Sequence, residues 1–240
     1  MEPFHFGASI RGPLHTQQKR PNEDAWLGCA GSFGRLIVVC DGLGSRRQAH
    51  RGSQMGCMAV REAVRLWSKT EEAPIQSLLW LIEVVWRIRV APSLPEECAT
   101  TCLFALRQPS RRWIIGGLGD GLGLIKQGPH TAVPVTGRHT DNFANQTDGL
   151  GCPHSINDWV VETISPSNEE TTVVLCTDGI ADDLVEERFD DFATWLMGTF
   201  ADLPPSKRWH ALSREIRHWP TPGHQDDKTL AILSQPTLSE

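Results

Sequence analysis

Two apolar stretches of this chain stop at an aspartate that is followed directly by glycine. Leu36–Cys40 runs into Asp41, and Val173–Cys176 is followed one residue later by Asp178. A single Asp-Gly pair is usually a turn. Two such pairs, each placed after a run apolar enough for a buried strand, suggest strands that carry carboxylates to one edge of a sheet. Carboxylate oxygens in such a place are the ligands that hard divalent cations prefer.

Two further acidic segments strengthen this interpretation. The chain has Asn22-Glu23-Asp24 near its start and Asp226-Asp227 near its end. Carboxylates brought together without cations would repel one another, and their pKa values would rise. The fold therefore either keeps these groups apart or gathers them around metal. We expect metal.

Composition narrows the class of protein. The 240 residues are 40% hydrophobic and 22% charged, which indicates one globular domain over residues 1–240. A net charge of −6 argues against nucleic-acid binding, which needs a basic face. No apolar run approaches the roughly 20 residues of a membrane span. The N-terminus lacks the form of a signal peptide, and the seven cysteines show no paired spacing, so we expect a cytoplasmic chain with reduced thiols and no membrane partner.

The order of predicted elements indicates an α+β fold. Strands, a helix pair, more strands, a second helix pair and a last strand follow one another, and the connection Gly119-Asp120-Gly121 has the length of a hairpin. Two antiparallel sheets between helix pairs, a four-layer αββα sandwich, would use all of them. The expected strands are 4–10, 25–29, 34–40, 99–107, 112–117, 122–126, 159–164, 171–176 and 229–233. The expected helices are 48–68, 75–89, 186–198 and 206–218.

The acidic segments and their neighbours carry a family resemblance. In order along the chain, the motifs are Asn22-Glu23-Asp24, Asp41-Gly42-Leu43-Gly44, Ala99-Thr100-Thr101, Gly119-Asp120, Cys176-Thr177-Asp178-Gly179 and Asp226-Asp227-Lys228-Thr229. As an ordered set they resemble the PP2C type (PPM) of metal-dependent protein serine/threonine phosphatases. Residues 12–15 and 145–147 resemble a bacterial branch of that family.

The resemblance implies a β-sandwich flanked by helices, with two Mn²⁺ or Mg²⁺ ions at one end. Asp41 would bridge the two ions, and Asp178 and Asp226 would complete the shell of the first. Glu23 and the Gly42 carbonyl would hold the second, and Asp24 would order its waters. A metal-bridging hydroxide would then attack phosphoserine or phosphothreonine directly.

The resemblance also implies the partners and a further metal site. We expect a monomer that acts on a phosphorylated protein and opposes a serine/threonine kinase. A third, weaker ion would use Asp182 and Glu96. Asp183 is an alternative for the first position, and Glu97 is adjacent to the second. As a plain alternative, Asp182 would be a cap or a first-turn acid of the following helix.

Two expected catalytic helpers depart from the family pattern. Where many relatives have a phosphate-binding Arg, this chain has Lys19 with Arg20 beside it, and either could attract phosphate. Lys acts as a point charge and cannot form the bidentate fork of Arg. Leu43 stands where eukaryotic relatives have a His proposed as general acid. Either His15 or a metal-bound water could take that task, and a structural loop histidine is the plainer interpretation of His15.

Three other functions would use some of the same features. A catalytically weak or inactive module on the same fold could bind a phosphorylated partner, and Lys19 and Leu43 favour it. An aspartate-nucleophile phosphohydrolase would need a second Asp at position 43. The glycines around Gly119 do not fit a dinucleotide motif in any register, and Asp120 is expected to cap a hairpin. Residues 127–157 are the expected flap over the cleft, where specificity would lie.

Overall fold

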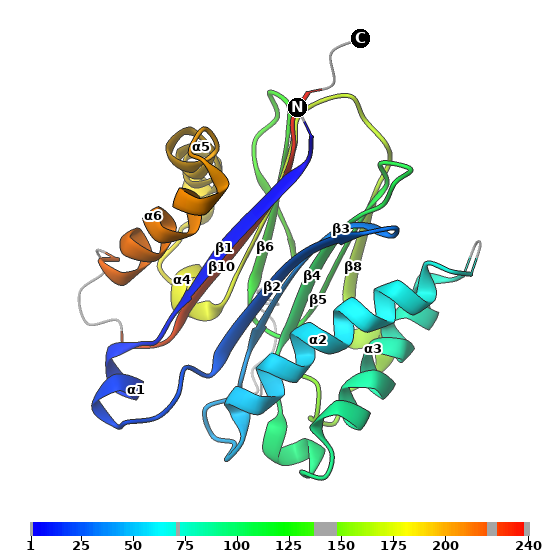
Figure 1. Ribbon diagram of the computed structural model, residues 1–240, viewed down its shortest axis with the longest axis vertical. Helices are drawn as coiled ribbons and strands as arrows, with labels where there is room; N and C mark the ends of the chain where they lie inside the picture. Colours follow the sequence, from blue (N-terminus) through cyan, green and yellow to red (C-terminus); the bar gives the residue numbers. More distant parts are fainter. Residues whose placement is uncertain (1, 71–72, 137–147, 220–224, 238–240) are drawn as a thin grey trace.

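Two antiparallel five-stranded sheets lie face to face at the centre of the molecule (Figure 1). The structure is a computed structural model, and it describes residues 2–70, 73–136, 148–219 and 225–237. The first sheet has the order β1 (Phe4–Ile10), β10 (Lys228–Gln235), β9 (Thr171–Cys176), β6 (Leu122–Gln127) and β7 (Val133–Thr136). The second has the order β2 (Asp24–Gly31), β3 (Gly34–Asp41), β4 (Cys102–Arg107), β5 (Trp113–Leu118) and β8 (Val160–Ile164).

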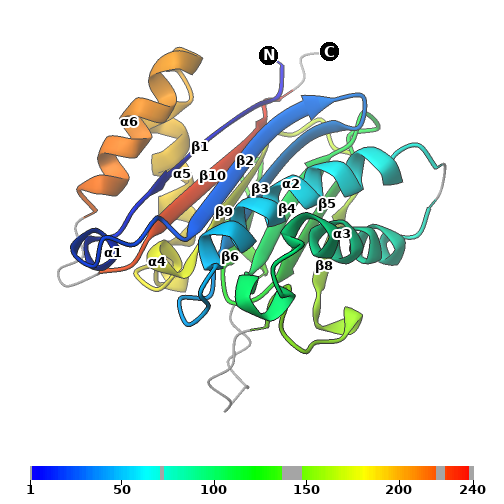
Figure 2. The same cartoon turned by 60° about the horizontal axis from the view of Figure 1, so that its bottom comes forward.

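Two long helices cover the outer face of each sheet (Figure 2). Helices α2 (Ala49–Trp67) and α3 (Ile75–Val90) pack on the second sheet, and α5 (Phe189–Phe200) and α6 (Pro205–Arg217) pack on the first. The result is four layers with three apolar cores, one between the sheets and one under each helix pair. The predicted α+β, four-layer αββα architecture is confirmed.

The central core shows why the sheets pair. Successive side chains of a strand point to opposite faces, so an uninterrupted apolar run suits a strand that is buried on both faces. In β3, Ile37 and Val39 face the other sheet, whereas Leu36 and Val38 face the helices. All four are fully buried. The uninterrupted apolar run before Asp41 therefore has a structural reason.

The predicted elements differ from the observed ones mainly at their ends. The strand expected from Ala99 begins only at Cys102. Before it, Thr100 forms isolated bridges to Gly42 and Leu150, and the Thr101 amide bonds to the carbonyl of Asp41 at the end of β3. Strand β7 was expected to be loop. Its Pro134 cannot donate a ladder hydrogen bond, which is tolerated because β7 is an edge strand.

Short helices make up the remaining elements. They are α1 (Pro13–Gln17), α4 (Asp178–Ala181) and the 3₁₀ turns Pro95–Cys98, Ile156–Asp158 and Glu186–Arg188. The first helix of the second pair, expected over 186–198, is divided between the last of these turns and α5. Within the described residues, no helix has both the length and the apolar character needed to cross a membrane.

Candidate metal centre

Strand register brings acidic residues from both sheets to one end of the sandwich. Asp24 begins β2 and lies opposite Asp41, the last residue of β3. In the other sheet, Cys176 at the end of β9 lies opposite Leu230, near the start of β10. Strand β9 therefore ends where β10 begins, and Asp178 follows β9 at this end of the sheet. The four acidic segments, far apart in sequence, meet there.

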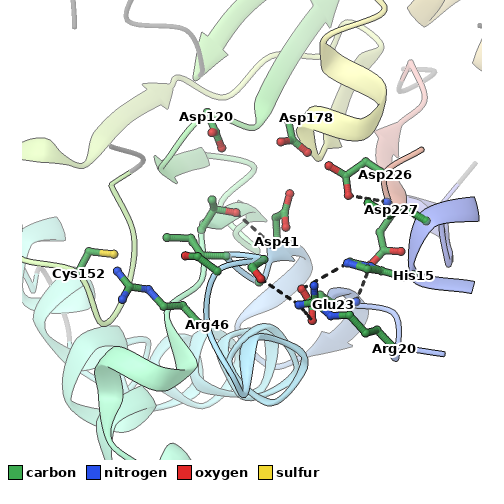
Figure 3. A pocket seen from close by; sticks show the side chains of 16 residues that line it. His15, Arg20, Glu23, Asp41, Arg46, Asp120, Cys152, Asp178, Asp226 and Asp227 are labelled. Atoms are coloured by element: carbon green, nitrogen blue, oxygen red, sulfur yellow. Dashed lines mark hydrogen bonds and ion pairs between the residues drawn. The ribbon is translucent and has the colours of Figure 1, made fainter. Parts of the chain in front are cut away.

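A cavity of about 490 Å³ opens at this edge. Figure 3 shows the carboxylates around it: Asp41 at the centre, Asp120, Asp178 and Asp226 opposite, and Glu23 to one side. Gly42, Thr101 and Asp227 also line it. The structure thus brings together Glu23, Asp41, Gly42, Asp178 and Asp226 from the sequence-predicted set.

The backbone of Asp41 is held by the segment that precedes β4. The Asp41 amide donates to the Thr101 hydroxyl at 3.0 Å. The Asp41 carbonyl accepts from the Thr100 hydroxyl at 2.7 Å and from the Thr101 amide at 2.8 Å. Next along the chain, the Gly42 amide donates to the Glu23 carbonyl at 3.0 Å. These bonds fix Asp41 beside Glu23, which gives the Ala99-Thr100-Thr101 motif a structural role.

Asp24 lies behind the cavity and not in its wall. Its Oδ2 accepts a 2.8 Å hydrogen bond from the Thr177 hydroxyl, which itself accepts from the Thr229 amide. Asp24 therefore links the second sheet to β9 and β10 of the first. Burial raises the pKa of Asp24 to about 8.

The carboxylates at the centre resist ionisation. Burial first, and then the nearby charges of Asp24 and Asp178, raise the pKa of Asp41 well above its ordinary value. Burial likewise raises the pKa of Asp178 to about 6, and the Asp226 charge adds to that shift. A concentration of negative charge in a poorly solvated place has this effect unless cations offset it.

Asp227 organises one side of the cavity. Its Oδ1 accepts from the Gly12 amide at 2.6 Å, and its Oδ2 accepts from the Glu23 amide at 2.6 Å. The same Oδ2 lies 2.8 Å from Nδ1 of His15, whose Nε2 is 3.7 Å from Glu23 Oε2. His15 is only 8% exposed. From the sequence, a role was expected for Asp226 and none for Asp227, so this role was missed.

The structure separates the two basic residues proposed to bind phosphate. Arg20 lines the cavity, and its Nη2 donates to Glu23 Oε1 at 2.6 Å and to the Gly44 carbonyl at 2.9 Å. Lys19 is exposed, has a positive φ of 55° and is not among the residues that line the cavity.

Asp120, Arg46 and Cys152 are among the lining residues that were not proposed as site residues. Asp120 follows β5 and faces the cavity (Figure 3), although it was expected to be a hairpin cap. An apolar run followed by Gly-Asp could have signalled this position. Arg46 and Cys152 lie at the far end of the cavity from Arg20, and nothing in their sequence surroundings pointed to them. Burial raises the pKa of the Cys152 thiol, and the Arg46 guanidinium opposes that shift.

The two residues expected at a third metal site lie elsewhere. Asp182 is exposed at the C-terminal end of α4, and Glu96 is exposed on a 3₁₀ turn. Neither lines the cavity. The structure does not bring these two residues into the carboxylate cluster.

The donor set fits hard divalent cations. Within the described residues, two buried carboxylate oxygens at the cavity, Glu23 Oε2 and Asp178 Oδ1, have no hydrogen-bond partner. No group of three or more Asp, Glu, His or Cys side chains in the same residues is drawn together closely enough to hold an ion by itself. Mg²⁺ usually keeps several waters and uses one or two carboxylates per ion, so a roomy ring of carboxylates suits such an ion.

Comparison with known sequences gives a family match. The protein phosphatase 2C family model matches residues 11–217 of the chain. A search of curated protein sequences gives no match.

Solved structures share the fold at low sequence identity. The photosystem II phosphatase PBCP superposes with a TM-score of 0.68 at 14% identity, over 98% of this chain and 100% of that one. The catalytic domain of the serine/threonine phosphatase PstP, in complex with two manganese ions, has a TM-score of 0.63 at 16% identity, over 97% of each chain. RsbX in complex with magnesium has a TM-score of 0.59 at 12% identity, over 96% of this chain and 94% of that one.

Proposed function

The chain belongs to the protein phosphatase 2C family, and we propose that it is an active, metal-dependent phosphatase of phosphoserine and phosphothreonine in proteins. The observation that carries this proposal is the convergence of Glu23, Asp41, Asp178 and Asp226 on one cavity from both sheets. Two of these acids, Asp41 and Asp178, have pKa values raised by burial and by neighbouring charge. A fold gains nothing in stability from such a cluster, which is the kind of arrangement found at functional sites.

Mn²⁺ or Mg²⁺ is the proposed cofactor, as two ions. Asp41 would contact both; Asp178 and Asp226 would hold one, and Glu23 with the Gly42 carbonyl would hold the other. When bound, such ions lower the pKa of water and offset charge on phosphoryl oxygens. Solved structures of PstP with manganese and of RsbX with magnesium support this choice. Because Asp120 lines the cavity and Glu96 does not, Asp120 is the better candidate for a third ion.

The chain's own residues prepare the site in three ways. Asp227 fixes the Glu23 backbone and orients His15, so the position of Glu23 does not depend on metal. Arg20 holds the Glu23 side chain through one nitrogen, which leaves further N–H groups to bind phosphoryl oxygens. Asp24 is bound by Thr177 behind the wall, where it would order water around the ions.

Residues 127–157 remain the proposed flap over the cavity. Part of this segment is outside the described residues. Within it, β7 pairs with β6, and Cys152 lines the cavity. Specificity for the substrate protein would therefore be expected on this side.

The test is release of phosphate from a phosphothreonine peptide and a phosphotyrosine peptide of the same sequence. With Mn²⁺ present, we expect release from the phosphothreonine peptide, and none with EDTA or in the Asp41→Asn variant. Release that persists in both would contradict the metal mechanism.

A second outcome would favour a different function. Mn²⁺ binding by calorimetry together with tight peptide binding, but without any turnover, would identify a module that binds phosphorylated partners. The existing bonds of Arg20 to Glu23 and Gly44 are the feature that favours this alternative, because they occupy part of the candidate phosphate-binding group.

A further inference from the structure

A second cavity lies beside the metal centre. It has a volume of about 530 Å³ and is formed by the segment between β1 and α1, the end of α6 and the start of β10. Its polar lining residues are Arg11, Thr16, Gln17, Arg217, Asp226 and Lys228. Asp226 also lines the first cavity, so the two cavities share a wall.

The lining of the second cavity is basic. Three cationic side chains come from three separate segments, and among the described lining residues Asp226 is the only acidic one. Within the described residues, none of Arg11, Arg217 and Lys228 forms an ion pair with a carboxylate. Uncompensated cations in a concave site attract anions.

Lys228 contributes less free charge than the two arginines. Its side chain is buried, at 7% exposed, and its ammonium donates to the Asp226 carbonyl at 3.3 Å. It also interacts electrostatically with Asp183 and Asp226. The surplus positive charge therefore comes mainly from Arg11 and Arg217.

Arg11 is already held in position. Its Nε donates to the Thr16 hydroxyl at 3.1 Å, and its Nη1 donates to the Arg20 carbonyl at 3.2 Å. The Thr16 hydroxyl in turn donates to the Gly12 carbonyl at 2.9 Å. A guanidinium that is fixed in this way loses little side-chain entropy when it binds an anion.

We propose that this second cavity binds a second phosphate group on the substrate protein, a few residues from the phosphate that is hydrolysed. The inference rests on the proposed phosphatase function, because it is the shared wall at Asp226 that places the two anions side by side. A phosphate is favoured over a carboxylate because it carries more charge and can accept from two arginines at once. The preferred substrate would then be a doubly phosphorylated segment.

The test compares two peptides on the Mn²⁺-loaded protein. Both carry one phosphothreonine, and one also carries a non-hydrolysable phosphonate at a series of nearby positions, so released phosphate reports only the first group. At the best spacing we expect KM to fall by about tenfold with kcat little changed. Arg217→Gln and Arg11→Gln should each remove most of this preference.

A matched control lies on the same helix. Arg214 is exposed on α6 and does not line the cavity, so Arg214→Gln removes the same charge and should keep the full preference. If Arg214→Gln also lost the preference, the effect would come from the overall charge of the protein and not from this cavity, and the proposed site would be wrong.

Binding measured without turnover separates this inference from the proposed function. Calorimetry of the same peptides with protein in EDTA should show tighter binding of the doubly anionic peptide, again lost in Arg217→Gln. Equal binding of both peptides overturns the inference even if the enzyme is active. Orthophosphate binding that is lost in Arg217→Gln, with no preference between the two peptides, would show that the second cavity binds a free anion. This outcome would also overturn the inference. Absence of turnover with the binding preference intact would contradict only the proposed function.

Discussion

The carboxylate of Asp227 lies 2.8 Å from Nδ1 of His15 and at the same time accepts hydrogen bonds from the backbone amides of Gly12 and Glu23. One side chain, 2% exposed, therefore joins three segments of the chain around the cavity. Its removal would leave two buried amide donors without partners.

We expect Asp227→Ala to lower the free energy of unfolding by about 2–4 kcal/mol, because buried groups that lose a charged hydrogen-bond partner carry a full desolvation penalty. Denaturant unfolding in EDTA measures this effect apart from any metal. The exposed Asp202→Ala variant is the control. An Asp227→Ala variant as stable as Asp202→Ala would show that these bonds add nothing.

Asp41→Asn should separate stability from metal binding. Burial, and then neighbouring charge, raise the pKa of Asp41, so its ionised form opposes folding in the absence of cations. In EDTA the variant should be more stable than the wild type by about 1 kcal/mol, or roughly 2–4 °C in Tm. Added Mn²⁺ should raise Tm in the wild type and leave the variant unchanged. A variant stabilised by Mn²⁺ as strongly as the wild type would exclude Asp41 as a ligand.

Arg20 and Lys19 can be distinguished by kinetics. Arg20 lines the cavity and contacts Glu23, whereas Lys19 is exposed outside it. Arg20→Gln should therefore lower kcat/KM for a phosphothreonine peptide by about 30–100-fold, as for a lost charged hydrogen bond. The loss in Lys19→Gln should be much smaller. The reverse order of effects would assign phosphate binding to Lys19.

A buried histidine–glutamate pair, on the helix side of the second sheet, predicts that the stability of the fold depends on pH. His154 Nε2 lies 2.5 Å from Glu83 Oε1 on α3. The hydrogen bond to Glu83 raises the pKa of His154, although burial opposes the shift. Because the folded state holds the proton more tightly, this stabilisation is complete below the unfolded pKa of about 6.5 and is lost as pH rises through the higher folded value.

The corresponding measurement is the free energy of unfolding in EDTA from about pH 6 upward. We expect a loss on the order of 1 kcal/mol above the folded pKa of His154. Glu83→Gln should flatten this part of the curve. His210→Gln, which removes an exposed histidine, should keep the slope. A wild-type curve without this fall would contradict the role given to the pair.

Much of the fold could be read from the sequence because β3 and β9 are buried on both faces. Both strands contain an uninterrupted apolar run, so Leu36–Cys40 and Val173–Cys176 stood out with little ambiguity. Short elements were missed for the opposite reason. Strand β7 has partly exposed residues and a proline, so its sequence resembles that of a loop.

The apolar-run pattern indicated a site residue only where that residue closely follows such a strand. Asp41 and Asp178 meet that condition, whereas Glu23 and Asp226 were expected from the ordered set of acidic motifs and the family resemblance. The importance of Asp227 depends on which distant amides reach it, and that follows from tertiary packing. The second cavity had no sequence signal, because Arg11, Arg217 and Lys228 come from segments that meet only in the folded chain.

Gly42 offers a last test, because its position leaves no room for a side chain. A Cβ at Gly42 would lie 2.5 Å from the Ala49 carbonyl oxygen and 2.8 Å from the Glu23 carbonyl oxygen, and both are backbone atoms that cannot move aside cheaply. At Gly44 the nearest atom would be Glu23 Oε2 at 3.7 Å, an ordinary contact. Gly42→Ala should therefore cost about 1–3 kcal/mol of stability, whereas Gly44→Ala should cost much less.

The same pair of variants tests the Gly42 carbonyl as a metal ligand. The shift forced by Gly42→Ala would move the backbone that joins Asp41 to Glu23, so Mn²⁺ should stabilise this variant less than the wild type in a thermal melt. Gly44→Ala should keep the full Mn²⁺ effect on Tm, because Asp41, Gly42 and Glu23 stay in place. Equal effects of Mn²⁺ on Tm in the two variants would show that ion binding does not depend on the position of Gly42.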